Sequence, residues 1–159
     1  MKNLSCCFTG HRDIPSYLVP EISEKIRTEA ERLIASGITH FYTGGAVGFD
    51  MLALKVLTQL KKSVPSMVLH VIAPCEGHMK NWNEESKAEF CRLIEDADEL
   101  KYLSPFYFSG CMQVRNRYLV DHSSYCIAFL ERNTGGSAYT VKYAEEKGLS
   151  VINIAGKIK

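Results

Sequence analysis

The sequence has no excess of charge of either sign and no hydrophobic run long enough to cross a bilayer. Its 19 Lys and Arg residues nearly balance 18 Asp and Glu residues, which gives a net charge of +1. No block of like charge predicts a nucleic-acid-binding arm or a membrane-surface helix, and no apolar run approaches the ~20 residues of a membrane span. We therefore expect no membrane partner, and the charge balance argues against a nucleic-acid partner.

Paired cysteine motifs are also missing. The six cysteines form no CxxC pair, and no apolar leader follows the first residues. Free thiols in a reducing cytoplasm are the expected setting.

Several common catalytic signatures are absent. There is no G-x-x-x-x-G-K-[ST] sequence, which excludes a P-loop nucleotidase, and the histidines show no spacing or cysteine pairing typical of zinc, so no metal site is predicted. The main glycine run lacks GxGxxG spacing and follows the second predicted strand rather than the first, which argues against the usual NAD fingerprint. The sequence identifies no cofactor.

The chain does contain a regular alternation of apolar, β-branched runs with helix-period segments. This pattern predicts an α/β, Rossmann-like fold with a mostly parallel sheet and helices on both faces. With 159 residues and no linker, we expect one domain spanning 1–159. The predicted strands are 4–9, 38–43, 67–73, 99–103, 125–130 and 149–154.

Five helices are expected between these strands. The first begins near Pro20 and ends at Ser36 and Gly37, with Ile22, Ile26, Ala30 and Leu33 on one face. The second begins near Phe49 and has the clearest apolar stripe, formed by Phe49, Leu52, Ala53, Val56, Leu57 and Leu60. The other three cover about 83–97, 112–122 and 137–147.

The run from Gly44 to Asp50 lies between the second strand and the second helix. Its glycines leave little side-chain bulk where a helix begins, and the unpaired N–H groups and the macrodipole at a helix start favour a phosphate or carboxylate. We name Gly44, Gly45, Ala46, Gly48 and Asp50 as candidate ligand-binding residues. The alternative is a tight structural turn in which Asp50 only stabilises the helix dipole.

Polar residues follow two further strands. In a doubly wound sheet, ligands bind beyond the carboxyl ends of the strands, so hydroxyls, glycines and a cation should meet along one edge there. An anion pocket needs close backbone approach and a countercharge. Each residue alone has a structural explanation, such as a turn or an N-cap. The candidates are Thr9, Gly10, His11 and Arg12 after the first strand, and Thr134, Gly135, Gly136 and Ser137 after the fifth.

Two more groups complete the candidate site. Arg115 and Arg117 are two positions apart on a predicted helix and point in different directions; we favour Arg115, with Asn116, as the cleft-facing residue, while a solvated face explains them equally well. Planar rings stack on planar ligands, so the aromatic residues could form a wall for a base, although core packing or a dimer contact is the more common role. These aromatic residues are Trp82, Tyr102, Phe106, Tyr107 and Phe108.

The combination of motifs resembles the SLOG superfamily. That superfamily includes the Rossmann-like domain of the DNA-processing protein Smf/DprA and the LOG phosphoribohydrolases, and this chain is most similar to the YpsA/YoqJ-like branch of small bacterial and phage proteins. The resemblance covers about 6–154 and implies a Rossmann-like fold that binds a nucleotide-derived ligand at two glycine motifs. The motifs are Phe8-Thr9-Gly10-His11-Arg12, Thr43-Gly44-Gly45-Ala46-Val47-Gly48-Phe49-Asp50, Ala73-Pro74-Cys75 with Asn81-Trp82, and Thr134-Gly135-Gly136-Ser137.

One departure from the LOG enzymes limits what the resemblance implies about activity. Those enzymes carry PGGxGTxxE with a catalytic glutamate, whereas Val141 or Lys142 occupies that position here. The resemblance therefore implies the phosphate-binding part of the motif, while the N-glycosidic hydrolysis of the LOG enzymes is not carried over to this chain on the resemblance alone.

The leading hypothesis is binding or sensing of a nucleotide-derived small molecule. The alternatives are a hydrolase acting on a nucleotide glycosidic or phosphate bond, with Asp50 as its acid or base, and a nucleic-acid or protein-interaction module. Whether the chain is an enzyme, and whether it forms a homo-oligomer, stays open at this point.

Overall fold

The computed structural model, which describes residues 2–156, contains a six-stranded parallel sheet in the order β4-β3-β2-β1-β5-β6. Every neighbouring pair runs parallel, and the register joins Thr9 to Ala128 between β1 and β5. The predicted α/β, Rossmann-like class is confirmed. The strands are β1 (Ser5–Gly10), β2 (His40–Thr43), β3 (Val68–Ala73), β4 (Glu99–Tyr102), β5 (Tyr125–Phe129) and β6 (Ser150–Asn153).

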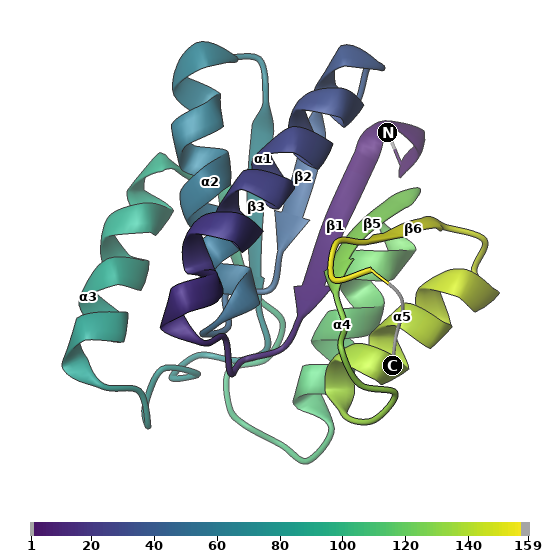
Figure 1. The fold of residues 1–159 in the computed structure, drawn as a ribbon. Helices are drawn as coiled ribbons and strands as arrows, with labels where there is room; N and C mark the ends of the chain where they lie inside the picture. Colours follow the sequence, from purple (N-terminus) through teal and green to yellow (C-terminus); the bar gives the residue numbers. More distant parts are fainter. Residues whose placement is uncertain (1, 157–159) are drawn as a thin grey trace.

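Helices cover both faces of the sheet (Figure 1). On one face, α1 (Val19–Ala35), α2 (Phe49–Ser63) and α3 (Glu84–Leu93) enclose the larger apolar core. On the other face, α4 (Cys111–Asp121) and α5 (Gly136–Glu146) pack over a smaller core.

The observed helices agree with those predicted from the sequence, with small differences. The buried residues of α1 are the four that were predicted. On α2, Leu54 is fully buried as well, while Leu52 is only half-buried, because this helix lies against the sheet and also contacts α1 and α3. The third helix ends at Leu93 and continues as a 3-10 turn, Ile94–Asp96; the sequence also failed to predict the short turns Lys2–Leu4 and Ser16–Leu18.

The direction of winding reverses at β1. From β1 the chain proceeds outward through β2, β3 and β4, and later returns to place β5 on the other side of β1. The segments that leave β1 and β5 therefore diverge at the carboxyl edge, which is where an open α/β sheet has its crevice. None of the helices found in residues 2–156 is both long enough and apolar enough to cross a membrane.

Candidate functional site: an arginine-lined pocket at the strand switch point

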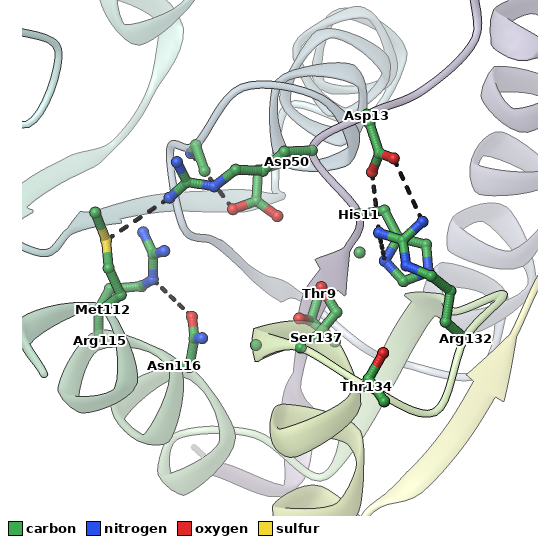
Figure 2. Close-up of a pocket in the computed structure, with 15 residues that line it drawn as sticks. Thr9, His11, Asp13, Asp50, Met112, Arg115, Asn116, Arg132, Thr134 and Ser137 are labelled. Carbon is green, nitrogen blue, oxygen red and sulfur yellow. Dashed lines mark hydrogen bonds and ion pairs between the residues drawn. The ribbon is translucent and has the colours of Figure 1, made fainter. Parts of the chain in front are cut away.

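A pocket of about 270 Å³ opens where β1 and β5 diverge (Figure 2). The predicted ligand-binding residues line it, with the exception of Gly44, Gly45 and Gly48. Three lining residues, Asp13, Met112 and Arg132, were not predicted. The full lining comprises Thr9, Gly10, His11, Arg12, Asp13, Ala46, Asp50, Met112, Arg115, Asn116, Arg132, Thr134, Gly135, Gly136 and Ser137.

His11 joins the two diverging segments. Its ring is buried just after β1, and the backbone N–H of Glu131 donates to its Nε2 atom at 2.8 Å. Nε2 must therefore carry no proton. Burial, with the nearby charge of Arg132, lowers the pKa of His11, so the neutral ring that this bond requires is the favoured form.

Arg132 and Asp13 form an ion pair across the same opening. The guanidinium donates to both carboxylate oxygens, at 3.1 and 3.3 Å, and these hydrogen bonds lower the pKa of Asp13. The pair is largely exposed, so its energetic value is small. Asp13 directly follows Arg12, and Arg132 lies two residues before Thr134, so extending the two predicted windows by one and two residues would have included them.

Arg115 enters the pocket from α4 and is 4% exposed. Its Nε atom donates to Asn116 Oδ1 at 2.8 Å, and Nη1 donates to the carbonyl of Gly44. Arg117 points elsewhere and reaches the hydroxyl of Tyr139. The structure thus brings Arg115 and Asn116, and not Arg117, to the cleft.

Asp50 is the carboxylate whose charge acts on this arginine. It lies in the first turn of α2, it is buried, and the backbone N–H of Ala46 donates to it at 3.4 Å. Burial raises the pKa of Asp50, and the charge of Arg115 opposes that shift. For Arg115, burial lowers the pKa more than Asp50 raises it. Asp50 therefore compensates the buried cation incompletely.

Arg12 is exposed at the mouth of the pocket. Its Nη2 atom contacts the sulfur of Met112 at 3.8 Å. A thioether is a weak acceptor, so this guanidinium can change partners at little energetic cost.

The glycine run acts through packing rather than by lining the pocket. A Cβ atom at Gly48 would collide with the backbone of Arg12, and one at Gly10 would collide with the ring of Phe49. Gly45 has φ +67 and faces Val71 and Phe90 in the core. These glycines let the β1 and β2 segments and α2 approach closely, so the structural alternative describes Gly45 and Gly48 better than ligand approach does.

The 134–137 loop brings the start of α5 to the opposite side of the pocket (Figure 2). Gly135 is the N-cap residue with φ +96, and no side chain caps the helix. The structural role considered for Thr134 and Ser137, as N-caps, is thus not observed. Thr134, Ser137 and the first residue of α5 line the pocket, and a helix start, with its unpaired N–H groups, favours an anion.

Comparison with known proteins places this geometry in a family. Residues 9–153 match the family model YpsA, described as the YspA SLOG family. The chain belongs to the YpsA SLOG family. It is 30% identical to the SPbeta prophage-derived protein YoqJ of Bacillus subtilis, over 79% of this chain and 81% of YoqJ. It is also 26% identical to a UPF0398 protein of Staphylococcus epidermidis, over 70% of this chain, but the match covers only 58% of that relative's length.

Two solved structures share the fold. The DNA-processing protein DprA of Streptococcus pneumoniae matches with a TM-score of 0.69 at 16% identity, over 99% of this chain and 52% of that one. DprA of Helicobacter pylori matches with a TM-score of 0.64 at 17% identity, over 94% of this chain and 64% of that one, and its structure is described as showing a single-stranded DNA binding mode.

This likeness corrects the expectation that argued against a nucleic-acid partner. The expectation rested on net charge and was wrong, because this chain shares its fold with a protein whose structure is described as showing single-stranded DNA binding. Net charge also hides local clustering: Arg12, Arg115 and Arg132 converge on one pocket in a chain whose total is +1.

Proposed function

We propose that this pocket binds the phosphate group of a nucleotide. The observation that supports the proposal most directly is the guanidinium of Arg115, which lines the pocket although the residue is nearly fully buried, so that burial disfavours its charged form. A buried cation in that state gains from an incoming anion. A phosphate presents oxygens to which a guanidinium can donate in fork geometry.

The rest of the lining suits the same ligand. Arg12 is free to turn from a thioether to a phosphate oxygen, and the start of α5 offers backbone N–H groups from the other side. The Rossmann-like sheet, with its crevice at the carboxyl ends of the strands, supports a nucleotide as the carrier of the phosphate. The six cysteines are all free thiols, which fits the cytoplasmic setting that we propose.

Single-stranded nucleic acid is the second candidate, and the likeness to the DprA fold favours it. The recognised chemistry is shared, because a free nucleotide and a nucleotide unit of a strand both carry phosphate oxygens. The two sources differ in length and in salt dependence: a strand that contacts several cations releases counterions, so its affinity falls steeply as salt rises.

Calorimetric titration separates these ligands. We expect AMP and inorganic phosphate to bind, and adenosine to bind far more weakly. We expect Arg115→Met to weaken the binding of AMP by about 1.5–3 kcal/mol, the range for hydrogen bonds to charged groups. Arg117→Met is the matched control, because it removes a guanidinium from the same helix outside the pocket. Circular dichroism verifies that both variants fold.

A second change keeps the test decisive if Arg115→Met fails to fold. Arg12→Gln removes an exposed cation from the pocket mouth, and it should weaken AMP without affecting adenosine. Adenosine binding as tightly as AMP, or phosphate binding that survives both substitutions, would overturn the proposal. Oligothymidylate that binds more tightly than AMP, with a steep salt dependence, would favour the strand.

A further inference from the structure

A second hollow adjoins the arginine-lined pocket. Its volume is about 540 Å³, and it shares two wall residues, Arg12 and Met112, with the first pocket. Three aromatic residues, His78, Trp82 and Tyr107, line this hollow together with Lys80 and Asn81. Met112 therefore lies in the shared wall between a pocket with three arginines and a hollow with three aromatic residues.

The two inner aromatic residues are held in place. His78 lies 3.3 Å from the carbonyl of Gly45 through Nε2, and its ring packs edge-on against Trp82 and Phe90, with ring centroids 5.2 Å from each. Trp82 in turn packs edge-on against Phe90, with the centroids 5.7 Å apart. Trp82 is half-buried. The indole is thus supported by the core and still lines the hollow.

Tyr107 contributes the outer aromatic surface. Tyr107 lines the hollow and is 69% exposed, so much of its surface is available to a ligand. The loop that carries it is anchored: Glu76 donates its backbone N–H to the carbonyl of Ser104, and Ser104 Oγ donates to the carbonyl of Phe106.

We propose that this hollow binds the base of the nucleotide whose phosphate occupies the arginine-lined pocket, with the base in contact with Trp82 and Tyr107. The inference rests on the proposed function, because it takes the phosphate position from it. Base–aromatic stacking tolerates any base, since each has a π-face. The ligand class is therefore a nucleotide with its base intact rather than a sugar phosphate.

The sizes of the two spaces agree with this division. Small-molecule pockets typically hold about 300–1,000 Å³, and the arginine-lined pocket, at about 270 Å³, is below that range. It suits the phosphate end of a ligand. The neighbouring hollow, at about 540 Å³, is within the range and has room for a purine or pyrimidine.

Arg12 and Met112 form the boundary between the two parts of the ligand. The guanidinium of Arg12 can rotate from the Met112 sulfur onto a phosphate, which frees the side chain of Met112 in the wall of the hollow. Methionine sulfur makes favourable contacts with aromatic rings. The movement that binds the phosphate therefore also exposes an apolar contact for the base.

Tryptophan fluorescence gives a direct test, because Trp82 is the single tryptophan of the chain. We expect AMP to quench or shift the emission, while ribose 5-phosphate and inorganic phosphate leave it nearly unchanged although calorimetry shows that they bind. Phosphate binding without any base-dependent change in emission would overturn this inference and leave the phosphate site intact. Failure of phosphate and AMP alike would instead contradict the proposed function.

Substitutions make the same distinction. Tyr107→Ala should weaken AMP roughly 5- to 150-fold, the range expected for loss of one stacked base, and should leave inorganic phosphate unchanged. Phe106→Ala is the matched control, because Phe106 is a similarly exposed aromatic residue of the same loop that does not line the hollow. Tyr107→Phe keeps the ring and should restore AMP affinity.

Equal losses in the Phe106 and Tyr107 variants, or a Tyr107→Ala protein that loses phosphate as much as AMP, would overturn the assignment of the hollow to the base. Oligothymidylate tests the source of the nucleotide. Quenching by the oligomer with the same Tyr107 dependence means that the hollow accepts a base of a strand, and quenching by AMP alone means that the ligand is a free nucleotide.

Discussion

Asp50 and Arg115, buried groups of opposite charge from α2 and α4, approach each other across Gly44. A Cβ atom on Gly44 would lie 2.7 Å from Asp50 Oδ2 and 2.9 Å from Arg115 Nη1. The missing side chain is thus what lets both charged groups reach the floor of the pocket. The carbonyl of the same glycine accepts a hydrogen bond from Arg115.

Alanine at Gly44 and at Gly48 should have different consequences. At Gly44 the added methyl meets the ends of two side chains, which can move, so we expect a folded protein with weakened phosphate binding. At Gly48 it meets the backbone of Arg12, and φ is +81, so we expect the free energy of unfolding to fall by about 1–3 kcal/mol or more. Urea unfolding and phosphate titration of both variants test this. Equal stability losses would contradict the different roles assigned to the two glycines.

Asp50→Asn should stabilise the protein at neutral pH. The pKa of Asp50 is raised on folding, so ionised Asp50 disfavours the folded state, and the stability available below the ordinary carboxyl pKa is lost as pH rises through the folded value. Asparagine does not ionise. The variant and the parent should therefore have similar free energies of unfolding near pH 4, and the variant should be the more stable at pH 7.

The same substitution should separate phosphate from ribose recognition. Loss of the negative charge beside Arg115 should tighten inorganic phosphate by about fivefold, because the charges interact in a partly buried, low-dielectric setting. If Asp50 also accepts hydrogen bonds from ribose hydroxyls, AMP should gain less than phosphate does. Calorimetry measures both. Weaker phosphate binding in Asp50→Asn would show that the carboxylate positions Arg115 instead of competing for it.

Stability should fall as pH drops below about 6.5, the ordinary histidine value. Burial lowers the pKa values of His11, His40 and His78 on folding, so the unfolded chain binds more protons in this range. Their contribution is present above that value and is lost as pH falls through the folded pKa values. His11→Gln keeps an acceptor for the Glu131 N–H but does not titrate, so it should reduce the slope of unfolding free energy between pH 5 and 7. An unchanged slope would assign the effect to the other two histidines.

AMP should remain intact in the presence of the protein. In the related hydrolases a glutamate stands where this chain has Val141 or Lys142; Val141 is buried in the core and Lys142 is exposed, and neither lines the pocket. Chromatography of AMP incubated with purified protein checks for free adenine. Release that depends on the protein and disappears in Asp50→Asn would establish a hydrolase, with the raised pKa of Asp50 suited to a general acid.

The sequence was sufficient for the fold because the strands and helices have strong, distinct periodicities. The six strands and five helices lie within a few residues of their predicted positions, and the buried face of α1 was predicted residue by residue. The rule that ligands bind beyond the carboxyl ends of parallel strands also predicted most of the residues that line the pocket, from Thr9 to Ser137, without knowledge of the strand order.

Two features required coordinates. The sequence predicted the glycine run as a ligand-binding segment. The close contacts that Gly45 and Gly48 make instead are with Phe90 and Arg12, which are distant from them in the sequence. The Arg132–Asp13 pair depends on loops 119 residues apart meeting at one edge. Periodicity predicts which face of an element is buried; it contains no information about which loop tips meet.

The bridging of two loops by His11 and Arg132 also has a mechanical consequence. β5, α5 and β6 come from the last quarter of the chain, and besides strand pairing they are tied to the start of the chain through Glu131 and Arg132. A ligand bound between Arg12 and the 134–137 loop would add a further connection between these two segments. When the protein is pulled from its ends, the C-terminal strands should detach at a higher force with ligand bound than without it. Occupancy of a small pocket would thus raise the mechanical stability of the sheet.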